Sequence, residues 1–217
     1  ELVVPDFANL NVEALAGAAL RRFSWKGRPF ETRLLGSYQP FNAALALTAA
    51  DVLCGRGWAI SDEAAASGIA SARWPGRFEV VGTSPLTIVD GGHNPQGAEA
   101  LAASLADLLG GEGCASVDFA LGVLADKDYR AMVRAVMPWA RSFSVYAPRS
   151  PRALAAEELA ACVRKVLGEE GRADDVPVRV CSAPADALSA ARAAAGPEGC
   201  AVAFGTLYAI ADLMAAL

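Results

Sequence analysis

The stretch LTIVDGGHNP, residues 86–95, decides the fold class more than any other part of the chain. A short apolar run ends on Asp90, two glycines turn the backbone, and His93, the only histidine in the chain, follows. A helical pattern then runs from residue 96 to 109. A strand that ends on a carboxylate and passes through a glycine-rich turn into a helix is where open α/β sheets bind ligands. The stretch therefore predicts a ligand site at a strand end.

The segment WPGRFE, residues 74–79, adds Arg77 after a Pro-Gly turn and beside the neighbouring β-run. A planar guanidinium suits a phosphate or a carboxylate, and an acidic residue at a strand end suits ribose hydroxyls. Each residue also has a structural alternative. Asp90 could cap the next helix, His93 could donate to a backbone carbonyl, and Arg77 could pair with Glu79 or Asp90. Together the three favour a site for a nucleotide or an acidic substrate.

From residue 78 onward, strand-like and helical runs alternate. This rhythm predicts an α/β fold: a Rossmann-like, mostly parallel sheet with right-handed crossovers and helices on both faces. The predicted strands are 78–82, 86–90, 117–123, 142–146, 176–180 and 201–204, and the predicted helices are 95–109, 129–137, 155–167, 184–195 and 207–217.

The first 70 or so residues read differently, as a β-hairpin at 21–35 followed by helices at 41–53 and 61–69. Because the chain starts on an apolar run without a clear beginning, we interpret it as cut from a longer protein. The predicted domains are 1–72, the tail of one domain, and 73–217, a complete Rossmann-like domain.

Composition excludes several classes of protein. The net charge of −5 and the lack of a basic block argue against nucleic acid, and no apolar stretch is long enough for a bilayer. No secretory signal opens the chain, so a cytoplasmic location is expected. The five cysteines, at positions 54, 114, 162, 181 and 200, are scattered without a C-x-x-C pair, which predicts reduced thiols and no metal site.

Two further strand ends carry polar residues. The segment LGVLADKD, residues 121–128, brings Lys127 to the rim of the same predicted crevice, whereas Asp128 is expected to cap the next helix. Gly205 and Thr206 end the last predicted strand, where free N–H groups could receive an anion and where Thr206 could equally be a cap. No G-x-x-x-x-G-K-[ST], G-x-G-x-x-G or G-x-S-x-G motif is present. Most of the phosphate-binding machinery is therefore expected elsewhere.

The ordered motifs resemble the C-terminal part of folylpolyglutamate synthase/dihydrofolate synthase, in the Mur ligase superfamily. They are GSYQPFNAA (36–44), WPGRFE (74–79), DGGHNP (90–95), LGVLADKD (121–128), APR (147–149) and FGTLY (204–208). Tyr38 and Gly92 depart from the family's usual histidine and alanine.

This resemblance implies an ATP-dependent ligase. ATP would phosphorylate a carboxylate of dihydropteroate or a folate, and the amine of L-glutamate would attack the acyl phosphate. By the same resemblance Asn42, Arg77 and Asp90 would contact ATP, and His93 would lie between ATP and glutamate as the catalytic residue. Substrate contacts would come from Lys127, Gly205 and Thr206.

The resemblance also implies that the N-terminal and central ATPase domains of the parent chain are partners. The central domain would hold the P-loop and the Mg²⁺ ligands, so residues 1–217 alone would be inactive. Two alternatives stay open: the C-terminal domain of a muramyl-peptide ligase, and a non-catalytic α/β domain that binds a small ligand or a partner. A self-sufficient nucleotide-binding enzyme is a third, which would require turnover by these residues alone.

Overall fold

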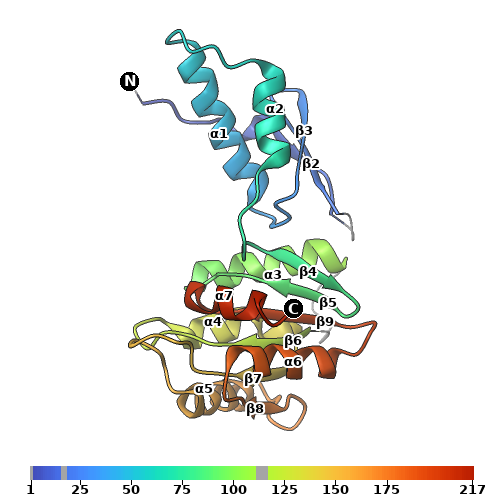
Figure 1. The fold of residues 1–217 in the computed structure, drawn as a ribbon, viewed down its shortest axis with the longest axis vertical. Helices are drawn as coiled ribbons and strands as arrows, with labels where there is room; N and C mark the ends of the chain where they lie inside the picture. Colours follow the sequence, from blue (N-terminus) through green and yellow to red (C-terminus); the bar gives the residue numbers. More distant parts are fainter. Residues whose placement is uncertain (1, 16–18, 111–116) are drawn as a thin grey trace. The chain divides into compact units, whose positions relative to one another are not determined.

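The computed structural model describes residues 2–15, 19–110 and 117–217, which form two compact units (Figure 1). The first unit is Glu1–Trp74 with Ser104–Gly110, and the second is Pro75–Ala103 with Gly111–Leu217. That residues 1–72 are the tail of a central ATP-binding domain stays a prediction. Cys114 lies outside the described residues, and the other four cysteines are free thiols.

The first unit is a small antiparallel sheet with two helices. Strands β2 and β3 form the predicted hairpin, and its turn is only Lys26-Gly27 because both residues adopt positive φ, as a two-residue type I′ turn requires. Phe23 and Phe30 stack across the two strands, 5.6 Å apart, and Leu47 joins their core. The elements are η1 (Phe7–Asn9), β1 (Leu10–Val12), β2 (Arg21–Trp25), β3 (Arg28–Thr32), α1 (Gln39–Cys54) and α2 (Asp62–Ser71).

The second unit is the predicted α/β domain with a mostly parallel sheet. The strand order is β4-β5-β9-β6-β7-β8, and only β4 runs antiparallel to its neighbour. The strands are β4 (Glu79–Thr83), β5 (Leu86–Val89), β6 (Val117–Leu121), β7 (Ala140–Val145), β8 (Val178–Val180) and β9 (Cys200–Phe204). The helices are α3 (Pro95–Leu109), whose residues from Ser104 onward belong to the first unit, α4 (Tyr129–Val136), η2 (Met137–Trp139), α5 (Ala156–Glu169), α6 (Pro184–Ala195), η3 (Leu207–Ala209) and α7 (Ile210–Met214).

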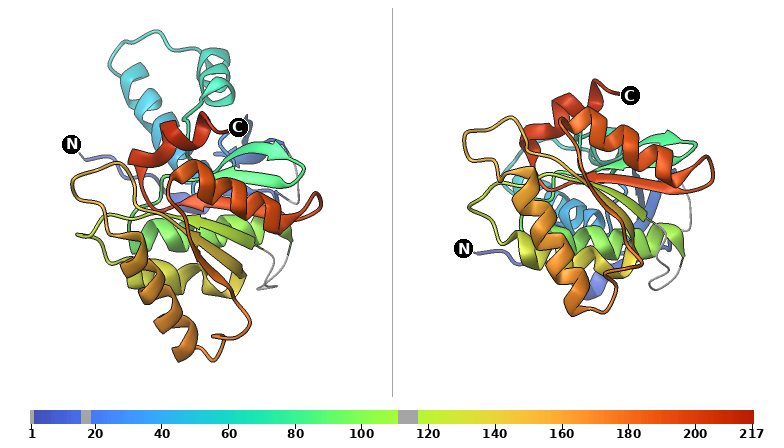
Figure 2. Two further views of the ribbon diagram at one scale, coloured as in Figure 1. Left: turned by 60° about the horizontal axis from the view of Figure 1, so that its bottom comes forward. Right: turned by 90° about the horizontal axis from the view of Figure 1, so that it is seen from below.

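Helices cover both faces of this sheet, as predicted (Figure 2). The chain steps outward from β6 to β8 and then returns to β9, so right-handed crossovers place α6 on the face opposite α4 and α5. Ala120, Ala201 and Ala203 face α6, and their small side chains let the helix pack closely. On the other face Phe119 contacts Phe143 and Phe204, with ring centroids 5.4 and 5.6 Å away.

Some predicted boundaries were too long. The strand expected at 176–180 is only Val178–Val180, an edge strand. The helix expected at 207–217 is a 3-10 turn followed by the short α7, which ends at Met214. Among the described residues, no helix is long and apolar enough to cross a membrane.

Candidate functional site

The predicted site lies where β5 and β9 end. These adjacent strands continue to opposite faces of the sheet, β5 to α3 and β9 to α7, and such a switch point opens a crevice at the carboxyl ends of the strands. Backbone hydrogen bonds join the two strand ends. The Asp90 N–H donates to Ala203 O at 2.8 Å, and the Gly205 N–H donates to Gly92 O at 3.0 Å. The turn that carries His93 is therefore held against the turn after β9.

Asp90 is a buried carboxylate, with 4% of the residue exposed. Its Oδ2 accepts from the Phe78 N–H at 2.8 Å and its Oδ1 from the Gly92 N–H at 2.7 Å. Burial raises the pKa of Asp90, while these two N–H groups and the nearby charges of Arg77 and His93 favour the ionised form. The carboxylate thus fastens two turns to each other.

The helix-cap alternative for Asp90 is wrong, because Asn94 occupies that position. The Asn94 side-chain oxygen accepts from the Gly97 N–H at 2.7 Å, and its carbonyl oxygen accepts from the Ala98 N–H at 3.0 Å. Pro95 is then the first helical residue, where its missing N–H costs nothing.

The turn before β4 presents Arg77. Gly76 and Phe78, on either side, both have positive φ, and the Phe78 ring is buried, so the turn is anchored by an aromatic side chain. The Gly91 N–H donates to Gly76 O at 2.6 Å, and the Gly76 N–H donates to Glu79 Oε2 at 2.8 Å. Arg77 lies between the two positive-φ residues of this anchored turn and is only half-buried.

Arg77 is half-buried, and its nearby charge offsets part of the rise in the pKa of Asp90 that burial causes. Within the described part of the chain, it forms no ion pair and donates no side-chain hydrogen bond. The alternative that Arg77 forms a salt bridge with Glu79 or with Asp90 is therefore wrong. Its guanidinium donors are available to a ligand, and a planar fork of donors fits phosphate or carboxylate oxygens.

His93 is half-buried, and its Nδ1 lies 3.0 Å from Gly91 O. Because a carbonyl oxygen only accepts, Nδ1 carries the hydrogen, and in the neutral ring Nε2 is left as an acceptor. The structural alternative for His93 is thus correct as far as Nδ1 is concerned. That bond orients the ring without using Nε2. Arg77 and His93 directly adjoin Phe78 and Gly92, whose N–H groups donate to Asp90, so the structure brings the three predicted residues close together.

The three predicted substrate residues lie at two strand ends. Gly205 has a φ of +114°, and a Cβ there would lie 2.3 Å from Gly122 O, so this position requires glycine. Thr206 is buried, and its Oγ1 accepts from the Tyr208 N–H at 3.2 Å, which is the capping role foreseen as an alternative. Lys127 lies in the loop after β6, with Nζ 3.5 Å from Asp126 Oδ2.

Asn42 belongs to the first unit, where it lies exposed on α1. Its Nδ2 donates to Gln39 Oε1 at 3.1 Å. The expectation that Asn42 contacts ATP stays a prediction. Among the described residues, no three His, Cys, Asp or Glu side chains are grouped so as to hold a metal ion.

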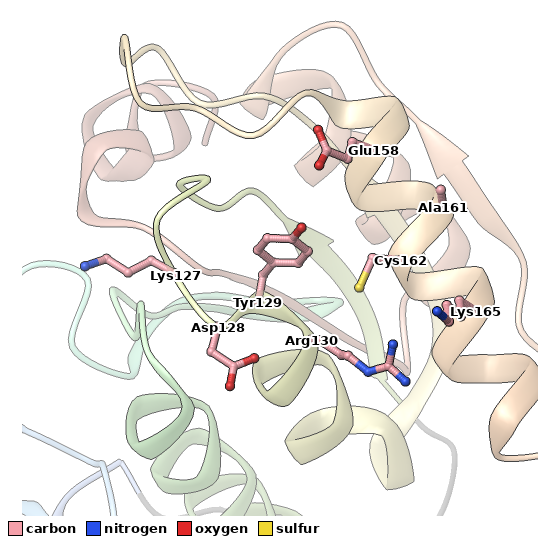
Figure 3. A pocket seen from close by; sticks show the side chains of 8 residues that line it. All are labelled: Lys127, Asp128, Tyr129, Arg130, Glu158, Ala161, Cys162 and Lys165. Carbon is pink, nitrogen blue, oxygen red and sulfur yellow. The ribbon is translucent and has the colours of Figure 1, made fainter.

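Sequence reasoning missed a cavity of about 480 Å³ between α4 and α5 (Figure 3). Asp128, Tyr129 and Cys162 are among its lining residues, and Asp128 also caps α4 by accepting from the Ala131 N–H at 3.0 Å. The Lys127 side chain extends away from Cys162 in Figure 3. Only the third dimension brings these two helices together, so no sequence signal pointed to the cavity.

Comparison with known proteins identifies the family to which this chain belongs. The family described as "Mur ligase, glutamate ligase domain" matches residues 76–207, which include Arg77, Asp90, His93 and Thr206. The chain therefore belongs to the Mur ligases, through their glutamate ligase domain.

Its relatives within that class are folate enzymes, as the motifs predicted. The chain is 35% identical to folylpolyglutamate synthase of Lacticaseibacillus casei over 126 residues, 57% of this chain and 28% of the relative. It is 34% identical to dihydrofolate synthase/folylpolyglutamate synthase of Bacillus subtilis over 153 residues, 69% of this chain and 35% of the relative. The chain thus spans little more than a third, at most, of these two relatives.

Solved structures of similar folate enzymes have the same fold. E. coli FolC in complex with ADP superimposes with a TM-score of 0.72 at 28% identity, covering 95% of this chain and 46% of that one. Mycobacterium tuberculosis folylpolyglutamate synthase complexed with ADP gives a TM-score of 0.73 at 28% identity, with the same coverage. ADP in both complexes implies that this family uses ATP.

Proposed function

We propose that this chain supplies the glutamate ligase domain of an ATP-dependent ligase that joins L-glutamate to a folate or dihydropteroate carboxylate. One observation carries the proposal: Arg77, Asp90 and His93 meet at the switch point of the sheet, inside the segment that matches the glutamate ligase domain. Relatives named folylpolyglutamate synthase and dihydrofolate synthase support the choice of a folate over other carboxylates.

Arg77, Asp90 and Asn42 would bind ATP. The guanidinium of Arg77 has donors to offer a phosphate. Asp90 already accepts two backbone N–H groups, so a ribose hydroxyl would use its remaining lone pairs while the carboxylate keeps both turns in place. Asn42, on α1, would be a further contact to ATP.

His93 would serve the amide-forming step. Transfer of the terminal phosphoryl group of ATP to the folate carboxylate gives an acyl phosphate and ADP. The glutamate nitrogen then attacks the acyl carbon, loses a proton, and phosphate leaves with the C–O bonding pair. Nε2 of His93 is an oriented acceptor because Nδ1 is bound to Gly91 O, so it could take a hydrogen from the amine. Such a site must also exclude water, which would hydrolyse the acyl phosphate.

Lys127, Gly205 and Thr206 would contact the substrate, and partner domains would supply the rest. We expect Mg²⁺, which neutralises phosphate charge, to be held with the P-loop in a central domain, because no metal-binding group occurs in the described residues. The N-terminal and central domains of a parent chain are therefore proposed partners. A cytoplasmic location suits this proposal, since the four described cysteines are free thiols.

The test is ATP-dependent ligation by the full-length protein that contains this chain. Dihydropteroate, folate monoglutamate and a UDP-linked muramyl peptide are offered separately with glutamate. His93→Ala is expected to lower kcat about 10²- to 10⁴-fold, the range for a general acid or base, and Arg77→Ala to raise KM for ATP. Arg179→Ala, an arginine on β8, is the matched control.

Turnover of the muramyl peptide in place of both folates would reassign the substrate. Binding of ADP without any ligation would favour the non-catalytic alternative. Ligation by residues 1–217 alone would show that no partner domain is needed.

A further inference from the structure

The turn that carries Arg77 has a backbone conformation that needs support from its surroundings. Gly76 has a φ of +70° and Phe78 a φ of +48°. Glycine adopts such angles freely, whereas an aromatic residue adopts them only where its neighbours hold it there. Because Arg77 lies between these two residues, the direction of its side chain depends on the contacts that hold the turn.

Three hydrogen bonds hold this turn. The Phe78 N–H donates to Asp90 Oδ2 at 2.8 Å, and the Gly91 N–H donates to Gly76 O at 2.6 Å. These two bonds connect the turn to the residues that follow β5. The third bond is local, from the Gly76 N–H to Glu79 Oε2 at 2.8 Å. Glu79 thus closes the turn on itself across Arg77.

Glu79 supports the arginine without neutralising it. It is the first residue of β4 and is half-buried. A carboxylate and a guanidinium two residues apart could form a strong ion pair. Within the residues that the structure describes, however, Glu79 forms no ion pair, and its Oε2 accepts from the backbone instead. The guanidinium of Arg77 therefore keeps its charge for a ligand.

The Gly76 N–H has little access to a substitute partner. Gly76 is buried, and a Cβ built on it would lie 2.6 Å from Cδ1 of Ile210, the first residue of α7. Water is thus poorly placed to replace the Glu79 carboxylate. Since a buried N–H without an acceptor is costly, loss of the carboxylate would make the turn rearrange to regain a partner, and Arg77 would move with it.

We propose that Glu79 is a positioning residue for nucleotide binding: by accepting from the Gly76 N–H, it holds the turn in the conformation that directs the Arg77 guanidinium to the phosphates of ATP. This inference rests on the proposed function, in which Arg77 binds ATP. A guanidinium that is already directed loses less conformational freedom on binding, so Glu79 contributes to ATP affinity without contacting the ligand.

The experiment measures KM for ATP and kcat in the full-length protein. Glu79→Ala is expected to raise KM for ATP roughly threefold to tenfold, the size of one hydrogen bond, and to leave kcat at saturating ATP near the wild-type value. Glu79→Gln keeps a side-chain oxygen that accepts, so it should recover most of the loss. Glu198→Ala, in the exposed turn before β9, is the matched control.

A double variant tests whether Glu79 acts through Arg77. In an Arg77→Ala background, Glu79→Ala should raise KM for ATP no further, because the group that it positions is already gone. An equal rise in both backgrounds, a fall in kcat at unchanged KM, or a Glu79→Gln variant as impaired as Glu79→Ala would each overturn the inference. Loss of folding in Glu79→Ala, shown by its melting temperature, would make Glu79 a stabilising residue and overturn it as well.

Two measurements separate the inference from the proposed function, because neither needs ligation. They are the Kd for ATP without folate or glutamate, and hydrogen exchange at the Gly76 amide. Both should rise in Glu79→Ala, and Glu79→Gln should remain close to wild type. If the wild-type protein ligates glutamate to no folate, the proposed function fails, yet these changes would still support the role of Glu79 in binding a nucleotide. An unchanged Kd in Glu79→Ala, or a full-length protein that binds no ATP, overturns that role.

Discussion

Replacing Asp90 by alanine should lower the free energy of unfolding of the second unit, and the structure gives the size of the effect. The carboxylate accepts the buried N–H groups of Phe78 and Gly92, and alanine leaves both without a partner. An unsatisfied buried N–H costs about 1–3 kcal/mol, so the two together cost about 2–6 kcal/mol. A carboxylate that contacted only solvent would have cost little.

The assay is urea unfolding of the wild-type and Asp90→Ala chains, with hydrogen exchange at the Phe78 and Gly92 amides. Exchange at both amides should rise in the variant. Asp128→Ala is the matched control, because Asp128 accepts a single N–H at the exposed start of α4 and its loss costs about 0.5–2 kcal/mol. If Asp90→Ala loses no more stability than Asp128→Ala and the two amides stay protected, the fastening role of Asp90 is refuted.

Two other variants test the packing of the second unit. The Tyr146 hydroxyl is buried without a hydrogen-bond partner in the described residues, so Tyr146→Phe should leave the free energy of unfolding unchanged or raise it by about 1 kcal/mol; a marked loss in urea unfolding would reveal a partner. The hydrogen bond from Arg130, helped by Arg134, lowers the pKa of Glu169 below its ordinary value of 4.5. Because the ionised form is favoured in the folded state, this stabilisation is present above 4.5 and is lost as the pH falls through the lowered pKa. Glu169→Gln should therefore melt slightly below wild type at neutral pH, and melts in acid should coincide; a gap that persists in acid would contradict this.

Much of the second unit could be predicted because its signals are local. Alternating strand-like and helical runs predict a parallel sheet, and the polar residues that follow each run mark its carboxyl edge. Arg77, Asp90 and His93 could be grouped for the same reason, since they follow or precede neighbouring strands. Local turn chemistry also predicted the β2–β3 hairpin, although not that its turn would shrink to Lys26-Gly27.

The remainder depends on contacts between distant segments. The burial of Asp90 follows from the β4–β5 hairpin, which brings the Phe78 N–H to its carboxylate. No sequence pattern tells whether a carboxylate at a strand end accepts from backbone N–H groups or is hydrated by solvent. The position of Arg152 beside Asp126 likewise depends on pairing between two loops that 26 residues separate.

The place of β9 has a consequence for how the protein is made. This strand separates β5 from β6, yet it follows both of them along the chain. During synthesis, β5 and its hairpin partner have no parallel neighbour until residues 200–204 have left the ribosome. A nascent chain stalled before that point exposes two unpaired sheet edges, and such edges invite aggregation. Chaperone dependence of the newborn chain should accordingly end only when this last strand emerges.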